Sequence, residues 1–160
     1  MLLSIALVTG IIALDQLVKY WALAVVRAAG EIPLIDGVFY FVYTENRGAA
    51  FSILQGRRWF FIVMTVVAVA IMVWMLKKNY ARNLWGRLGI LFVIGGALGN
   101  FIDRMRLGYV IDMFDFRLIN FAVFNVADSF IVVGGIMVVI YFLFMDEKLR
   151  KAQQHELDKN

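Results

Sequence analysis

The stretch WFFIVMTVVAVAIMVWML, residues 59–76, contains no charged side chain. A helix needs ~20 mainly apolar residues to cross a hydrocarbon core of ~30 Å, and this stretch comes close to that length. The whole chain is similarly apolar, with 62% hydrophobic and 18% charged residues. Ordinary soluble domains have ~45–50% hydrophobic and ~25% charged residues. The sequence therefore predicts an all-α membrane protein rather than a soluble domain.

Three further apolar runs predict three more spans, so we expect one membrane domain over residues 1–160 with four transmembrane helices. The first run resembles a signal peptide but lacks its basic start, so we expect it to be retained as a helix. Its only interruptions are Asp15, Gln16 and Lys19, and the only charge in the last run is Asp128. The predicted spans are about 2–26, 59–76, 86–105 and 118–145.

An even number of spans places both termini on one side of the membrane. The loop 77–87 and the polar tail 146–160 together hold eight Lys and Arg residues, whereas the opposite side holds seven. The loop is short and dense in charge, so the positive-inside rule favours cytoplasmic termini. The segments 27–58 and 106–117 then lie outside, and the run GVFYFVYT after Asp36 predicts a strand there. We read the net charge of +4 as membrane-flanking charge, not as a nucleic-acid surface.

Three aspartates lie at similar heights in three different spans. At ~1.5 Å per residue, Asp15, Asp103 and Asp128 are roughly 21, 24 and 26 Å from the inner ends of their helices. Asp15 has a simple explanation, because Lys19 follows it by four residues and can neutralise it. Asp128 has no such cation, and an unpaired intramembrane carboxylate indicates a functional site.

The third span contains GGALGNFIDR, residues 95–104. Gly95 and Gly99 form a small-residue face that allows close helix approach. Asn100, Asp103 and Arg104 continue this surface, either as an interfacial salt bridge or as part of a site.

The chemistry open to this chain is that of carboxylates. It has no cysteine, and its only histidine, His155, lies in the polar tail, which argues against thiol chemistry, His-dependent catalysis and a metal centre. Two aspartates at a poorly solvated site share one proton, so one can activate water while the other donates a proton. The candidate pair is Asp128 with Asp112 or Asp115.

Two rival classes fit some of these features. A proton or ion conductor would use Asp15, Asp103 and Asp128 as a relay, but their common depth argues against a path across the membrane. A non-enzymatic scaffold built on Gly95 and Gly99 leaves Asp128 unexplained.

Five motifs occur in order along the spans, and together they resemble the lipoprotein signal peptidases, the signal peptidase II or peptidase A8 family. Each is weak alone, but the ordered set is specific. The motifs are D-Q-x-x-K at 15–19, N-x-G-A-A-F at 46–51, G-G-A-x-G-N-x-x-D-R at 95–104, G-x-V-x-D at 108–112 and F-N-x-A-D-S at 124–129.

The resemblance implies a four-transmembrane-helix bundle with a small extracytoplasmic β-cradle in the bacterial plasma membrane. It implies an aspartic endopeptidase that removes signal peptides from diacylglyceryl-modified prolipoproteins and cuts on the N-terminal side of the lipidated cysteine. The active site would lie near the outer face and need no cofactor. The expected partners are prolipoproteins and membrane lipids, the expected state is a monomer, and family members are targets of globomycin.

The resemblance also implies roles for individual residues. The catalytic pair would be Asp112 and Asp128. One departure concerns Met113, because the family usually has Phe after the first catalytic aspartate, and here Asp-Phe occurs at 115–116. We favour Asp112, with Asp115 as the alternative. The residues expected to bind substrate or support the site are Asp15, Lys19, Asn46, Gly48, Asn100, Asp103, Arg104, Asn125 and Ala127.

Overall fold

The structure is a computed structural model that describes residues 2–48 and 56–145. The predicted polar tail and the last three residues of the motif at 46–51 lie outside the described residues. Within the described ranges, four helices are long and apolar enough to cross a membrane. They are formed by α1 (Leu2–Trp21) with α2 (Arg27–Ala29), by α3 (Arg58–Lys77), by α4 (Leu84–Arg106) and by α5 (Val126–Ile140). A π-helical turn (Ala22–Val26) joins α1 to α2, and another (Tyr141–Met145) extends α5.

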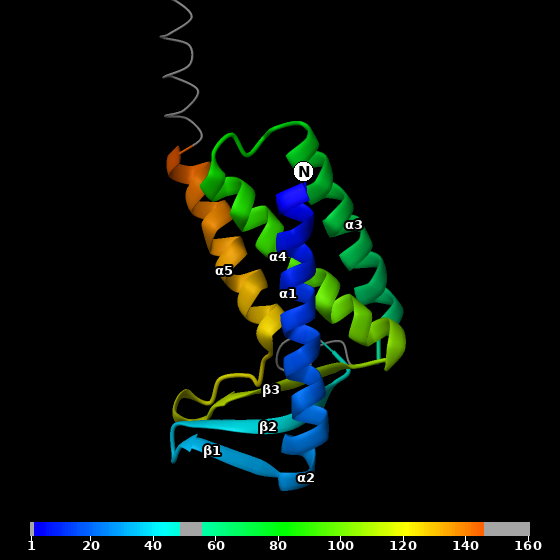
Figure 1. Cartoon of the computed structure of the whole chain (residues 1–160), viewed down its shortest axis with the longest axis vertical. Helices are drawn as coiled ribbons and strands as arrows, with labels where there is room; N and C mark the ends of the chain where they lie inside the picture. The colour runs from blue at the N-terminus through cyan, green and yellow to red at the C-terminus, as the bar shows by residue number, and fades with distance from the viewer. Residues whose placement is uncertain (1, 49–55, 146–160) are drawn as a thin grey trace, which may run out of the picture.

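A small antiparallel sheet lies across one end of the helix bundle (Figure 1). Its strands are β1 (Glu31–Ile35), β2 (Phe39–Asn46) and β3 (Val110–Phe116), in the order β1-β2-β3. The beginning of α1 and the end of α5 both lie at the opposite end of the bundle. The predicted four-helix architecture with a small sheet is therefore confirmed, and β2 overlaps the predicted strand at 37–44.

One predicted boundary was wrong. The fourth span was expected to begin near residue 118, but α5 begins at Val126. Asn125 caps the helix, since its side chain accepts a hydrogen bond from the Asp128 amide and the Asp128 side chain accepts one from the Asn125 amide. The apolar residues before it form a short 3-10 helix, η3 (Arg117–Ile119), and an irregular segment. The segment 106–117, predicted to lie outside the membrane, consists largely of β3.

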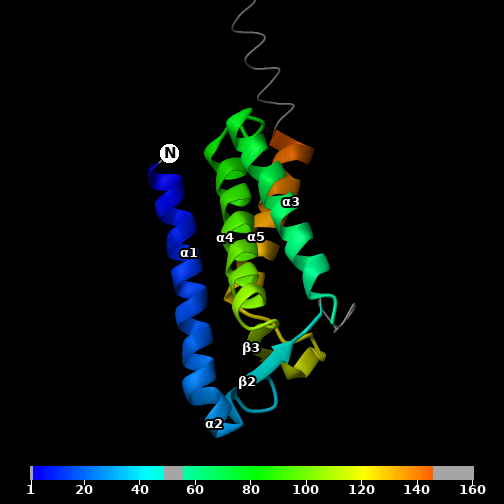
Figure 2. The same ribbon diagram turned by 90° about the vertical axis from the view of Figure 1, so that its right-hand side faces the viewer.

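The central helix is α4, which packs against α1, α3 and α5 and contains ten buried residues. In Figure 2, α1 and α3 lie on either side of it. Its glycines allow this close packing: a Cβ on Gly99 would lie 2.6 Å from Asp15 Oδ2, and a Cβ on Gly96 would overlap the carbonyl oxygen of Ala127. The expected packing face at Gly95 and Gly99 is thus directed at α1, where Gly95 meets Ile11.

The third strand connects the sheet to the bundle through its two faces. Ile111 and Met113 are buried against Ala22 and Val26 at the end of the first span. Side chains alternate along a strand, so Asp112 points the other way, toward the space between the helices. This alternation separates the carboxylate from the hydrophobic anchor of the strand.

We expect Gly96→Ala to destabilise the protein by about 1–3 kcal/mol, because a methyl group there must push α4 and α5 apart. Unfolding of the purified protein in detergent, followed by circular dichroism, measures the effect. Gly135→Ala on α5 is the matched control, since a Cβ at that position has no neighbour within 4 Å. Equal stability of the two variants would contradict close helix packing at Gly96.

Candidate functional site

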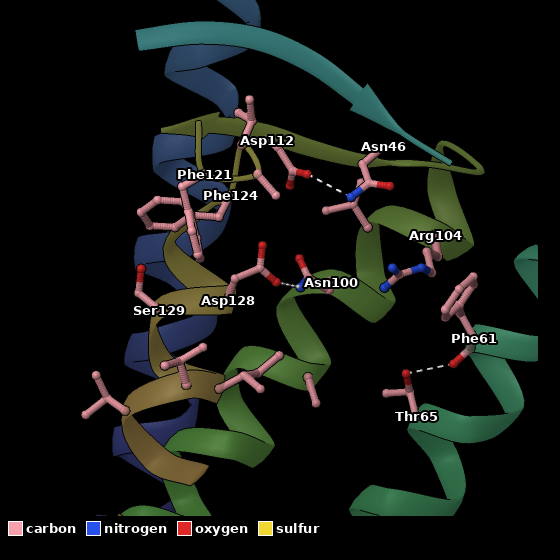
Figure 3. Close-up of a pocket in the computed structure, with 17 residues that line it drawn as sticks. Asn46, Phe61, Thr65, Asn100, Arg104, Asp112, Phe121, Phe124, Asp128 and Ser129 are labelled. Carbon is pink, nitrogen blue, oxygen red and sulfur yellow. Dashed lines mark hydrogen bonds between the residues drawn. The ribbon is translucent and has the colours of Figure 1, made fainter. Parts of the chain in front are cut away.

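A cavity of about 640 Å³ lies between α3, α4, α5 and the sheet, with the polar groups concentrated at its sheet end (Figure 3). Asp112 and Asp128 both line it. Its other walls are mainly apolar, with Phe61 and Thr65 from α3 and Val132 from α5. The remaining lining residues are Asn46, Ala97, Asn100, Arg104, Val110, Phe121, Ala122, Val123, Phe124, Ser129, Ile131 and Val133.

Behind the cavity, Lys19 is a buried cation whose hydrogen-bonding capacity is fully used. Its Nζ lies 2.9 Å from Asp15 Oδ2 and 2.9 Å from Asp103 Oδ2. Its third bond, also 2.9 Å, goes to Asn100 Oδ1. A Lys ammonium has three N–H donors, so each one is satisfied. Gln16 completes this cluster by donating to Asp103 Oδ1 at 2.9 Å.

The two carboxylates of this cluster also hold backbone groups in place. Asp15 Oδ1 accepts a hydrogen bond from the amide of Ala127 on α5, at 2.9 Å. Asp103 Oδ2 accepts one from the amide of Ile111 on β3, at 3.2 Å. The cluster therefore links the first span, α4, α5 and the sheet around one point, and it positions the residues next to Asp112 and Asp128.

The orientation of Asn100 follows from Lys19. Because its Oδ1 accepts from Lys19 and from Asn125, its amide nitrogen must face away from them. That nitrogen donates to Asp128 Oδ1 at 2.7 Å. Asp128 Oδ2 accepts a second bond, from the backbone amide of Asn125 at 3.2 Å. Both oxygens of Asp128 thus have fixed donors.

Asn125 connects the two cavity carboxylates. Its Oδ1 accepts from the Asp128 amide at 2.9 Å, so its amide nitrogen is free to donate elsewhere. It donates to Asp112 Oδ1 at 2.6 Å and to Asn100 Oδ1 at 3.1 Å. The helix cap of α5 is therefore also the connection between Asp112 and Asp128.

Asp112 is buried and receives a second hydrogen bond, from Asn46 Nδ2 to its Oδ2 at 2.9 Å. Burial, reinforced by the negative charge of Asp128, raises the pKa of Asp112 from 3.8 to about 7. The hydrogen bonds from Asn46 and Asn125 oppose this rise because they favour the ionised form. At neutral pH the carboxyl group of Asp112 is thus close to its midpoint of titration, as expected of a group that exchanges protons.

Arg104 is the cation of the cavity. Its Nη2 donates to the carbonyl oxygen of Gly48 at 3.2 Å, and its guanidinium lies 4.9 Å from the centre of the Phe61 ring. The Gly48 amide in turn donates to Asn46 Oδ1 at 2.9 Å. Arg104 therefore ties the end of β2 to α4 and leaves its charge beside both carboxylates.

The structure separates the two aspartates that the sequence left as alternatives. Asp115 lies outside the cavity and pairs with Arg117 at 3.0 Å. Met113 is fully buried in the core between the sheet and the first span, where it packs with Ile111, Ala22 and Val26. The spacing of three residues places Asp112 and Asp115 on opposite faces of β3.

Apart from the alternative Asp115, the residues predicted for the site either line the cavity or are hydrogen-bonded or ion-paired within the network behind it. Gln16, Phe61, Thr65 and Ser129 were not predicted. Gln16 had a signal, because it lies between Asp15 and Lys19 in the same motif. The α3 residues had none, since they occur in an uncharged span. In the described ranges, no group of three or more His, Cys, Asp or Glu side chains is arranged to hold a metal ion.

The solved structures similar to this chain include two that are described as bacterial membrane enzymes determined by the in meso method. One, at 2.3 Å, has a TM-score of 0.83 with 31% identity and covers 89% of this chain and 88% of its own. The other, at 1.9 Å, has a TM-score of 0.81 with 31% identity, and the match covers 91% of this chain and 95% of the solved chain. The protein is accordingly a multi-pass membrane protein.

The lipoprotein signal peptidase of Clostridioides difficile (strain 630) is 46% identical over 149 residues, which cover 93% of this chain and all of that protein. That of Streptococcus thermophilus (strain CNRZ 1066) is 45% identical over 140 residues, covering 88% of this chain and 91% of the relative. The family described as signal peptidase (SPase) II matches residues 7–144. The chain belongs to the signal peptidase II family.

Proposed function

We propose that this protein is an aspartic endopeptidase that removes signal peptides from diacylglyceryl-modified prolipoproteins. One observation supports it above all: Asp112 and Asp128 line the same cavity and are joined through Asn125, which donates to one and caps the helix of the other. Signal peptide removal follows from membership of the family, and the pair of carboxylates supplies its chemistry.

The proposed reaction uses one proton shared by the two aspartates. Asp112, whose pKa is about 7, holds that proton, and ionised Asp128 accepts a proton from water. The water oxygen attacks the carbonyl carbon of the scissile peptide bond while Asp112 protonates the carbonyl oxygen. The tetrahedral intermediate then collapses: one hydroxyl returns its proton to Asp112 as the carbonyl re-forms, the carbon–nitrogen bond breaks, and the leaving amine takes a proton from Asp128. The products are the signal peptide and a lipoprotein with a free amino group on its modified cysteine.

The cavity is suited to a substrate that lies in the membrane. The cavity walls far from the sheet are apolar and lie between α3 and α5, whereas the hydrogen-bonding groups are at the sheet end. We place both termini in the cytoplasm and the sheet end at the outer face, so the scissile bond on the N-terminal side of the lipidated cysteine meets the aspartates near the interface. Every group in this scheme comes from one chain, so a monomer suffices.

We expect Asp112→Asn and Asp128→Asn each to lower kcat/KM for a diacylglyceryl-modified prolipoprotein by at least about 10³-fold, because neither variant can pass a proton between water and the peptide. The measurement is cleavage by the purified protein in detergent, followed by the release of signal peptide. Asp115→Asn is the matched control on the same strand and should retain activity. Loss of activity in Asp115→Asn alone would overturn the assignment of Asp112.

We also expect activity to fall as the pH rises through about 7, since Asp112 then loses the proton that the reaction requires. Above that point kcat/KM should decrease by up to about tenfold per pH unit, with an apparent pKa that belongs to the pair. The measurement is the pH profile of cleavage between pH 5 and 9. A flat profile above pH 7 would contradict a proton held by Asp112.

A measurement without substrate tests the same group. The pKa of Asp112 is raised in the folded protein, so its carboxyl stabilises the folded state below pH 3.8, and this contribution is lost as the pH rises to about 7. The melting temperature of the wild type should therefore fall more between pH 5 and 8 than that of Asp112→Asn. Equal slopes would show that Asp112 titrates at its ordinary pKa.

A further inference from the structure

The free end of the sheet exposes large apolar side chains. Ile35 at the end of β1 pairs with Phe39, which pairs with Phe116 on β3. The following residues return to this end, because the Leu118 amide donates to the Val38 carbonyl at 3.4 Å. We call the exposed set the apolar tip; its members are Leu34, Ile35, Leu118, Ile119 and Phe121, each between 51% and 67% exposed.

The apolar tip is continuous with the surface that α5 presents to lipid. The Phe121 ring lies 5.8 Å from Phe124, whose ring stacks on Phe116 at 5.9 Å. Phe121 and Phe124 share the cavity wall with Val132 on α5. Val132 is 59% exposed, and the apolar exposure continues along α5, a membrane span, to Ile136.

Polar contacts of Arg117 lie beside the apolar tip. Arg117 donates to Glu31 Oε2 on β1 at 2.9 Å and to Asp115 Oδ2 on β3 at 3.0 Å. Its guanidinium also lies 3.8 Å from the centre of the Tyr40 ring on β2. One arginine thus connects all three strands next to Leu118 and Ile119. Arginine and tyrosine beside apolar side chains are typical of the boundary between lipid and water.

We propose that the apolar tip inserts into the bilayer beside α5, so that its partner is a lipid surface. A contiguous exposed apolar surface of this kind marks an interaction site. Because the tip continues the lipid-facing surface of α5, the bilayer is the partner that covers both. Insertion fixes the height of the sheet, and with it Asp112 on β3, relative to the membrane boundary.

The chain contains no cysteine, so one introduced cysteine can carry a nitroxide label specifically. The full chain with Ile119→Cys is labelled and reconstituted in vesicles of phosphatidylethanolamine and phosphatidylglycerol. Collision with oxygen, which concentrates in lipid, is compared with collision with a water-soluble nickel chelate. Ala29→Cys is the matched control, because it is exposed at the outer end of a first span of 28 residues, which is longer than the ~20 residues needed to cross the hydrocarbon core.

We expect the ratio of oxygen to nickel accessibility to be several-fold higher at residue 119 than at residue 29. A ratio as low as that of Ala29→Cys would place the tip in water and overturn the proposal. Low accessibility to both reagents would also overturn it, because protein, such as a second copy of the chain, would then cover the tip. Neither reading depends on peptidase activity, so the result is independent of the proposed function.

A second pair of variants tests the surface rather than one position. With the label at Ile35→Cys, the double substitution Leu118→Gln and Ile119→Gln should lower the oxygen-to-nickel ratio several-fold. The melting temperature should not change, since both side chains are exposed. The control Leu2→Gln with Leu3→Gln alters two apolar residues that are even more exposed, at the other end of the molecule, and should leave the ratio unchanged. A ratio at residue 35 that is unaffected by the tip substitutions would contradict insertion.

Discussion

The buried ammonium group of Lys19 is the constraint on which the site depends. A cation removed from water is costly unless it is paired and hydrogen-bonded, and removing one partner of a buried pair typically costs 3–5 kcal/mol. Lys19 meets this requirement with the carboxylates of Asp15 and Asp103 and the side-chain oxygen of Asn100. Once that oxygen is engaged, the amide of Asn100 can only face Asp128. A charge that never contacts the cavity thus orients the hydrogen bonds within it.

Close helix packing and the polar cluster require each other. Asp15 reaches the Ala127 amide on a different helix, which is possible only because α4 has glycine where it passes between them. A side chain at Gly99 would occupy the space of the carboxylate, and one at Gly96 the space of the α5 backbone. Conversely, the hydrogen bond links α1 to α5 across α4, where lipid exerts little hydrophobic force between helices. The small residues are therefore part of the site, although they have no chemistry of their own.

The polar half of the site could be predicted from the sequence because a charge within an apolar span is conspicuous. Counting residues along the spans placed three aspartates at one depth, and the structure joins them through one cluster. The apolar half had no comparable signal, since nothing distinguishes Phe61 from its neighbours in an uncharged helix. Hydropathy also misplaced the start of α5, because an apolar run has the same hydropathy whether it forms a helix or an irregular segment. The capping pair of Asn125 and Asp128 was the local signal that hydropathy does not weigh.

The apolar walls between α3 and α5 have a kinetic consequence. A site entered from within the bilayer responds to the mole fraction of substrate among lipids, not to the amount of substrate per volume of water. Adding inert lipid at constant substrate and enzyme would then slow the reaction by surface dilution. Growth of the membrane and synthesis of substrate together set how far such an enzyme is saturated. On the proposed function, the position of the cavity between α3 and α5 links processing to the amount of lipid in the membrane.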